Sequence, residues 1–248
     1  MMLLENLSYV EVEAYLVEKD IVIIPIGSTE QHSPYGLIGT DFITAEAIAR
    51  EVGKRLDILV APTLTYGMSQ HHMGFKGTVT LSPETMIGVI KDIVNSFLDH
   101  GFRRIVFING HGGNIEPVKT AFTQLKYENK KGIFEIISWF LLPEVQEIER
   151  DIFEDKNGYH ATPSEVSITK LLRPEAFKTK PSEKKRLTKP RNQIYYPLSR
   201  EEFKQAYPDG RMESAPWLAK EKYGKLIMEE AVRVISNRIR EILKMKIL

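Results

Sequence analysis

A continuous apolar run, Ile21–Ile26, is the feature that most constrains the fold of this chain. Most of its residues are β-branched and no polar residue alternates with them, which is typical of a strand covered on both faces. Similar but less regular runs predict strands at Asp57–Leu64, Arg104–Ile108 and Phe134–Ser138. Because Pro25 lacks a backbone N–H, we expect the first strand to end or bend there.

Segments with helical periodicity separate these strands. Helices are expected at about 9–17, 41–56, 83–100, 115–129, 163–172 and 218–244. Strands that alternate with helices predict an α/β fold of three layers (αβα) with a mostly parallel sheet. We find no domain boundary, so residues 1–248 are expected to form a single domain. Residues 178–216 are basic and weakly periodic, and we interpret them as a loop-rich lid or subunit-contact segment.

Composition excludes several classes of protein. The formal net charge of +1 gives no broad basic surface, so nucleic acid is not an expected partner. The chain has no cysteine, which rules out disulfides and thiolate metal sites. No signal peptide is recognisable, and no apolar run approaches the roughly 20 residues of a membrane helix. We therefore expect a cytoplasmic protein without membrane contact, and its many Lys and Glu residues favour a thermophilic origin.

Candidate metal ligands follow the first strand. Glu30 and His32 are two residues apart, so in an extended segment both side chains point the same way. Carboxylate oxygen and imidazole nitrogen are common ligands of divalent transition metals. Asp41 comes nine residues after His32, at the start of a predicted helix. The alternatives are an ordinary loop glutamate and surface histidine, with Asp41 as a helix N-cap.

His111 lies in a glycine-rich turn, residues 109–114, after a later strand. A dinucleotide site is not expected, because Ile115 stands where the third glycine would be and Ser138 replaces the acidic residue. Since ligands bind beyond the carboxyl ends of parallel strands, we expect several side chains to meet at one sheet edge. They are Glu30, His32, His71, His72, His111 and Trp139.

His160 and Glu165 form a further candidate pair. Glu165 follows Thr162 by three residues, so it is either the glutamate of a capping box or a functional carboxylate. His160 precedes the predicted helix and is free to enter a site.

Three motifs carry a resemblance to a known family. They are Gly27-Ser28-Thr29-Glu30-Gln31-His32 with Asp41, Asn109-Gly110-His111-Gly112-Gly113-Asn114, and His160-Ala161 with Glu165. In these motifs the chain resembles the creatininase (creatinine amidohydrolase) family, from about Pro25 to Gly224.

The resemblance implies a hydrolase with two divalent ions, Zn, Mn or Fe, assembled as a homohexamer. Glu30 and His111 would bind one ion, His32 the other, and Asp41 both. His160 matches the catalytic histidine, and Glu165 matches a glutamate that acts as a base or as a metal ligand. The matching positions for substrate contact are Ser69, His72, Gly112 and Trp139.

Two glycines depart from creatininase proper. Gly112 and Gly113 stand where that enzyme has an aromatic residue and then a metal-binding glutamate. The resemblance thus leaves one ion short of a ligand, which Glu165 or water would replace. It also makes creatinine itself a less favoured substrate.

The resulting hypothesis is hydrolysis of a non-peptide C–N bond in a small molecule, either a cyclic amide or a formamide. Within the family, the alternatives are deformylation of a formamidopyrimidine and ring opening of a carbohydrate-derived compound. A hypothesis of another class is a non-catalytic assembly protein stabilised by metal. His160 speaks against it, because a structural site needs no proton-transfer group.

Overall fold

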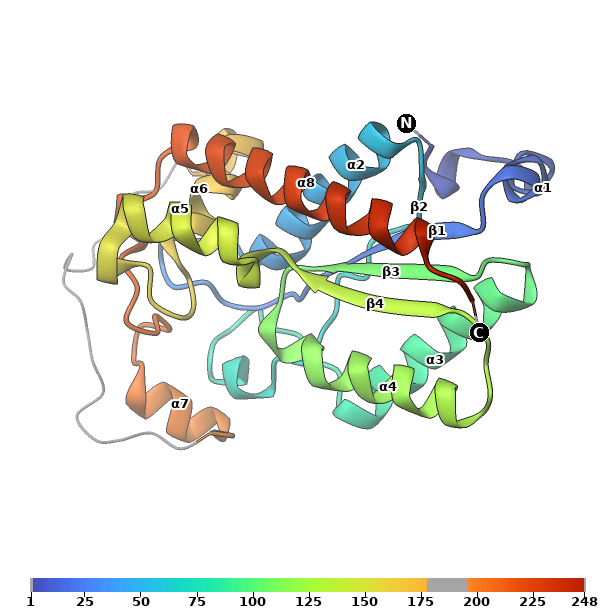
Figure 1. The fold of residues 1–248 in the computed structure, drawn as a ribbon. Helices are drawn as coiled ribbons and strands as arrows, with labels where there is room; N and C mark the ends of the chain where they lie inside the picture. The colour runs from blue at the N-terminus through green and yellow to red at the C-terminus, as the bar shows by residue number, and fades with distance from the viewer. Residues whose placement is uncertain (1, 178–195, 248) are drawn as a thin grey trace.

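The computed structural model describes residues 2–177 and 196–247. A sheet of four parallel strands lies at its centre, in the order β2-β1-β3-β4 (Figure 1). The strands are β1 (Ile21–Ile26), β2 (Leu59–Val60), β3 (Arg104–Asn109) and β4 (Ile133–Ser138). Helices cover both faces, which confirms the predicted three-layer α/β fold.

The two helical layers differ in size. One face is covered by α2 (Thr40–Leu56), α5 (Pro143–Phe153), α6 (Pro163–Leu172) and α8 (Glu221–Lys244). The other is covered by α3 (Pro83–Asp99) and α4 (Ile115–Tyr127), while α1 (Tyr9–Glu18) packs near the sheet edge. Short 3-10 helices are η1 (Leu4–Asn6), η2 (Gln70–Gly74), η3 (Gly112–Asn114), η4 (Trp139–Leu141), η5 (Glu154–Lys156), η6 (Pro174–Ala176) and η7 (Pro216–Leu218).

Strand β1 supplies both hydrophobic cores. Ile21 and Ile23 pack with residues of α2 and α8, whereas Val22 and Ile24 pack with residues of α3 and α4. Successive side chains of a strand point to opposite faces, so a strand between two helical layers must be apolar throughout. Burial of each such side chain contributes about 1.5–3 kcal/mol.

Two details of the sheet differ from the sequence prediction. β2 has only 2 residues, far fewer than the strand predicted over 57–64. β1 continues through Pro25, which pairs with Ile108 of β3. The carbonyl of Pro25 accepts from the N–H of Leu64, on the side of the sheet where β2 has already ended. The N–H that proline lacks would face that same side, so no bond to β3 is lost.

Two helices were not predicted. Helix α5 has only 11 residues and many of them are charged, so its apolar stripe is hard to recognise in the sequence. Helix α7 (Arg200–Ala206) lies within the predicted loop-rich segment 178–216. Its capping box, formed by Ser199 and Glu202, is a local signal that could have revealed it. The rest of that prediction, including the basic run 181–191, lies largely outside the described residues.

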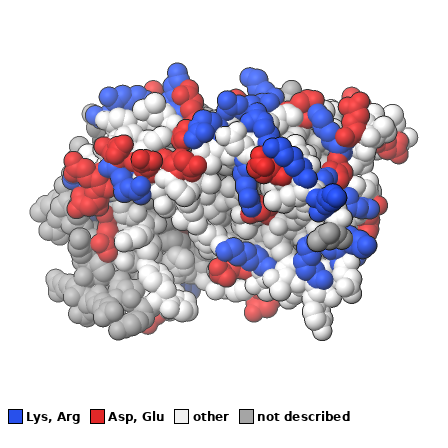
Figure 2. Space-filling view, viewed as in Figure 1, with Lys and Arg blue, Asp and Glu red and all other residues white. Residues whose placement is uncertain are grey.

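The surface seen in Figure 2 carries interspersed acidic and basic side chains along α8, as the small net charge suggests. Among the described residues, no helix combines the length and the apolar character needed to cross a membrane.

Candidate metal centre

The carboxyl ends of β1 and β3 bring the candidate ligands together. Glu30 and His32 lie in the segment that leaves β1, and His111 lies in the turn that leaves β3. Asp41 comes from the first turn of α2. All four side chains are almost fully buried, with at most 5% of each residue exposed. The structure therefore places them at the predicted edge of the sheet.

Asp41 stands between two histidines. Its Oδ1 lies 2.9 Å from Nε2 of His32, and its Oδ2 lies 3.1 Å from Nδ1 of His111. Glu30 lies beside His111, with Oε2 at 3.3 Å from Nδ1. Donor atoms of two sets, Glu30 with Asp41 and His111, and His32 with Asp41 and Glu165, each lie within 4.8 Å of one another. Asp41 belongs to both sets.

The histidines are anchored in a way that turns one nitrogen toward these carboxylates. Nε2 of His111 donates to the carbonyl of Met68 at 2.9 Å, and Nδ1 of His32 donates to the carbonyl of Glu30 at 3.2 Å. The opposite nitrogen of each ring faces Asp41, and it offers a lone pair there whenever the ring is neutral. Histidines that bind metals typically make this kind of second hydrogen bond, which fixes the tautomer.

Several buried atoms in this cluster lack a hydrogen-bond partner among the described residues. They are Oε1 of Glu30, Nε2 of His32 and Oδ2 of Asp41. Buried polar atoms are rarely left without partners, since each costs about 1–3 kcal/mol. A cation between these lone pairs removes that cost, so the residues present fit a bound divalent metal ion.

The pKa shifts within the cluster also favour a bound cation. Burial alone would raise the pKa of Glu30, but His111 and His72 hold it well below its usual range. Burial alone would lower the pKa of His32, but the Asp41 carboxylate raises it to about 9. In the metal-free protein, protons on the imidazoles offset the buried carboxylates. A metal ion would displace these protons on binding.

Glu165 forms a capping box and also lies beside the candidate metal ligands. Its Oε2 accepts from the backbone N–H of Thr162, and the Thr162 hydroxyl accepts from the N–H of Glu165, which completes a capping box. Its carboxylate also lies within reach of His32 and Asp41. Burial raises the pKa of Glu165. By contrast Asp41 is no N-cap, because α2 begins at Thr40 and its N-cap is Gly39.

Comparison with known proteins decides the family. A family profile described as creatininase, creatinine amidohydrolase, matches residues 5–239. The chain belongs to the creatininase family. A crystal structure of creatinine amidohydrolase (creatininase) superposes with a TM-score of 0.84 at 24% identity, covering 99% of each chain.

Two curated relatives of this chain are named for different activities. A mycofactocin precursor peptide peptidase of Mycolicibacterium smegmatis is 38% identical over 116 residues, which are 44% of this chain and 47% of the relative. A creatinine amidohydrolase of Pseudomonas putida is 34% identical over 132 residues, covering 49% and 51%. The chain thus spans about half the length of these curated relatives.

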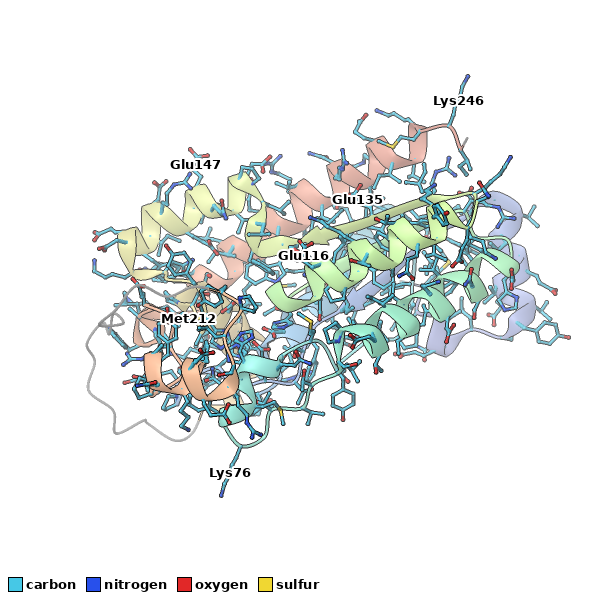
Figure 3. The ribbon with its side chains drawn as sticks, turned by 90° about the horizontal axis from the view of Figure 1, so that it is seen from below. Lys76, Glu116, Glu135, Glu147, Met212 and Lys246 are labelled. Atoms are coloured by element: carbon cyan, nitrogen blue, oxygen red, sulfur yellow. The ribbon has the colours of Figure 1, made fainter. Side chains whose placement is uncertain are left out.

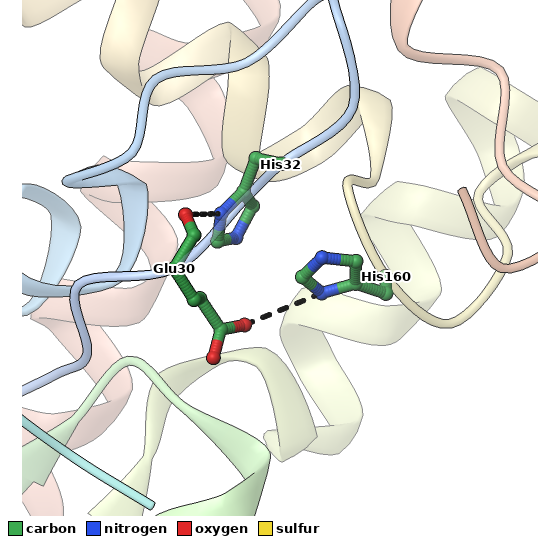
Figure 4. A group of neighbouring side chains, drawn as sticks. All are labelled: Glu30, His32 and His160. Carbon is green, nitrogen blue, oxygen red and sulfur yellow. Dashed lines mark hydrogen bonds and ion pairs between the residues drawn. The ribbon is translucent and has the colours of Figure 1, made fainter. Parts of the chain in front are cut away.

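His160, which we predict to be the catalytic histidine, lies beside Glu30 and His32 (Figure 4). Its Nε2 lies 2.7 Å from the carbonyl of Gln31, so this nitrogen carries the proton. Its Nδ1 lies 3.5 Å from Oε1 of Glu30 and holds the lone pair. Burial lowers the pKa of His160 to about 3, so the ring is neutral at pH 7.

Gln31 is a positioning residue that the sequence analysis did not single out. Its side-chain NH₂ group lies 2.9 Å from Nδ1 of His72 and 3.0 Å from the carbonyl of Gly210. These two acceptors use both of its hydrogens. The same group is 3.1 Å from Nε2 of His160, which must therefore keep its own proton. The sequence signal for Gln31 was its position between two candidate ligands, Glu30 and His32.

Ser69 and His72 both contact the carboxylate of Glu30. The Ser69 hydroxyl donates to Oε2 of Glu30 and is fully buried. Nε2 of His72 lies 3.4 Å from Oε1 of Glu30, and its ring stacks on His160. Burial lowers the pKa of His72 well below its usual value. The predicted substrate contacts of both residues therefore stay predictions, although His72 also lines the cavity.

The glycines after His111 differ in their surroundings. A Cβ atom on Gly113 would lie 2.2 Å from the carbonyl oxygen of Met68 and 2.5 Å from Nε2 of His111. A side chain at this position would therefore clash with the backbone, so a glutamate, the ligand expected here by resemblance, has no space. A Cβ atom on Gly112 would meet nothing within 4 Å, and this residue lines the cavity.

A cavity of about 870 Å³ opens beside the cluster. Its lining includes Glu30, Asp41, His111, His160 and Glu165. Trp139 is not part of that lining, because its side chain is buried in the hydrophobic core with α5 and α8. Phe140, the next residue, lines the cavity instead. An aromatic wall of the kind predicted at Trp139 is therefore supplied one position further on.

Proposed function

We propose that this protein is a divalent-metal-dependent amidohydrolase with two ions that share Asp41. Glu30, Asp41 and His111 would hold one ion, and His32, Asp41 and Glu165 the other. The observation that carries this proposal is the pair of anchored histidines, whose free nitrogens face the two oxygens of one buried carboxylate. Glu165 takes the place of the ligand for which Gly113 leaves no space.

The chain's own groups suit hydrolysis of an amide. When bound, the ions would lower the pKa of a water molecule and polarise the amide carbonyl. His160 keeps its proton on Nε2, and its Nδ1 would pass a proton from the attacking water to the leaving nitrogen; its low pKa makes it a weak base but favours release of that proton to the leaving group. Gly112 lines the cavity, so its backbone N–H is the group we propose for stabilising the oxyanion.

The size of the cavity bears on the substrate. Cavities of roughly 300–1,000 Å³ hold drug-sized ligands, so a volume of about 870 Å³ favours a substrate larger than creatinine. One curated relative is named a peptide peptidase. A peptide-derived amide is therefore our second candidate, and we no longer restrict the proposed substrate to non-peptide C–N bonds. Formamides and carbohydrate-derived rings stay in the screen.

Metal analysis of the purified protein is the first test. We expect two ions of Zn, Mn or Fe per chain, and Asp41→Asn should reduce both while Asp92→Asn on the surface of α3 should not. Absence of bound metal after loading with each ion would refute the proposal.

A hydrolysis screen is the second test. Creatinine, formamides, lactones and short peptides would be offered to the protein loaded with each metal. We expect at least one C–N bond to be cleaved, with His160→Ala lowering kcat and sparing metal content. Tight metal binding without turnover of any amide would favour the non-catalytic assembly protein. The predicted homohexamer would be examined by light scattering on the same samples.

A further inference from the structure

Glu149, on α5, is a buried carboxyl that no step of the proposed reaction uses. Only 6% of the residue is exposed, and it lines the cavity. Its Oε1 is buried without a hydrogen-bond partner among the described residues. Glu147, two residues earlier on the same helix, is exposed and points away from the body of the molecule (Figure 3). On α5, Glu149 is therefore buried whereas Glu147 is exposed.

Among the described residues around Glu149 there is no buried cation that would offset its charge. Burial raises the pKa of Glu149 to about 7, against a hydrogen bond from Ser164 that lowers it. The carboxylate of Glu165 raises this pKa further, and Arg150, which is exposed, lowers it. In the part of the chain that the structure describes, the groups that act on Glu149 thus leave its negative charge incompletely offset. An unpaired buried carboxylate is costly, and such groups are concentrated at functional sites.

The outer part of the cavity is acidic as well. Glu154, Asp155 and Glu213 line it in addition to Glu149, whereas Arg150 is the one Lys or Arg among the described lining residues, and Glu154 forms an ion pair with Lys156 outside the lining. Acidic side chains gather over α5, toward the left in Figure 2. None of these carboxylates belongs to the sets that can share a metal ion with Asp41. Their field would attract cationic molecules and repel anions.

We propose that Glu149 binds a guanidinium or ammonium group of the substrate. This subsite lies beside the metal centre and uses none of the proposed metal ligands. The Glu149 carboxylate, which borders the cavity, accepts a hydrogen bond from an N–H of that group, and the positive charge offsets the buried carboxylate. The amide to be cleaved then lies toward Asp41 and His160, while the cationic group lies toward α5. This inference rests on the proposed function, because it names the class of amide that the same cavity accepts.

The test compares two probes of similar shape that differ in charge. Ethylguanidinium and the neutral N-ethylurea would be titrated by calorimetry into the metal-loaded full-length protein, so that the metal-binding carboxylates are already occupied. We expect ethylguanidinium to bind more tightly than N-ethylurea. Glu149→Gln should weaken the binding of ethylguanidinium about tenfold or more, since it removes a charge-assisted hydrogen bond. It should leave N-ethylurea nearly unchanged.

Glu147→Gln is the matched control, because it removes the same charge from the same helix at an exposed position. Equal binding of the two probes by the unmodified protein would overturn the inference, as would an equal loss in both variants. Circular dichroism and metal content of Glu149→Gln must match those of the unmodified protein. If they do not, Glu149→Leu serves instead, because it removes the charge without leaving an unpartnered polar group, and ethylguanidinium binding that is unaltered in that variant also counts against the inference.

This titration measures binding and needs no turnover. If the hydrolysis screen finds no substrate but ethylguanidinium still binds through Glu149, the proposed function fails alone. If amides are cleaved with no preference for cationic ones, the assignment of Glu149 fails alone. Glycine anilide and propionanilide, which differ by an ammonium group, provide that comparison of kcat/KM.

Discussion

At the residue scale, the two glycines that follow His111 have different neighbours. A side chain at position 112 would extend into the cavity, whereas one at position 113 would meet the Met68 carbonyl and the His111 ring. The sequence showed only that both positions depart from creatininase. Which departure matters for the metal depends on the position of Met68, a residue more than forty positions away in the chain.

This contrast gives a paired prediction. Gly113→Ala should destabilise the protein by about 1–3 kcal/mol, because the backbone must shift to admit the methyl group. It should also weaken metal binding, since the clash displaces His111. Gly112→Ala should change neither property. Urea unfolding and metal titration measure the two effects, and similar behaviour of both variants would contradict this account.

At the scale of elements, α6 links its own stability to the site. Thr162 and Glu165 form its capping box, and the same glutamate lies within reach of His32 and Asp41. Helix α1 carries an equivalent box, Ser8 with Glu11, far from the cavity and exposed. The two boxes are alike as local patterns, so the capping pattern by itself does not distinguish Glu165 from Glu11; only the resemblance in the motif with His160 marked Glu165 as a candidate functional residue.

The two capping boxes can be compared by experiment. Thr162→Ala and Ser8→Ala should each cost about 1 kcal/mol of stability, because each leaves a helical N–H without its cap. Only Thr162→Ala should also lower metal affinity, since Glu165 loses the segment that holds it. Thermal unfolding of the metal-free proteins and metal titration separate the effects. Equal metal affinity in both variants would show that the cap does not orient Glu165.

At the scale of the whole molecule, buried charge makes stability depend on pH. Folding raises the pKa of Glu149 from 4.5 to about 7, mainly through burial. Between these pH values the folded protein keeps a proton that the unfolded chain has released. The contribution of Glu149 to stability is therefore fully present below pH 4.5 and is lost as the pH rises through 7.

Glu149→Gln cannot ionise, so it should escape this loss. In EDTA at pH 8 we expect the variant to be more stable than the unmodified protein by up to about 3 kcal/mol, with the difference vanishing near pH 4. Glu147→Gln, on the exposed side of α5, should show no such trend. Urea unfolding from pH 4 to pH 8 measures it. A difference independent of pH would show that packing, and not charge, separates the variants.

The sequence by itself determined the layers of the fold, because the periodicity of strands and helices and the caps at helix ends are local properties of the chain. It also determined that Glu30, His32 and His111 meet at one edge, since parallel strands end together. Only the tertiary structure decided that Asp41 faces two histidines, that Phe140 and not Trp139 lines the cavity, and that Glu149 is buried. Those outcomes depend on which distant backbone lies against each side chain, and a short sequence window does not contain that information.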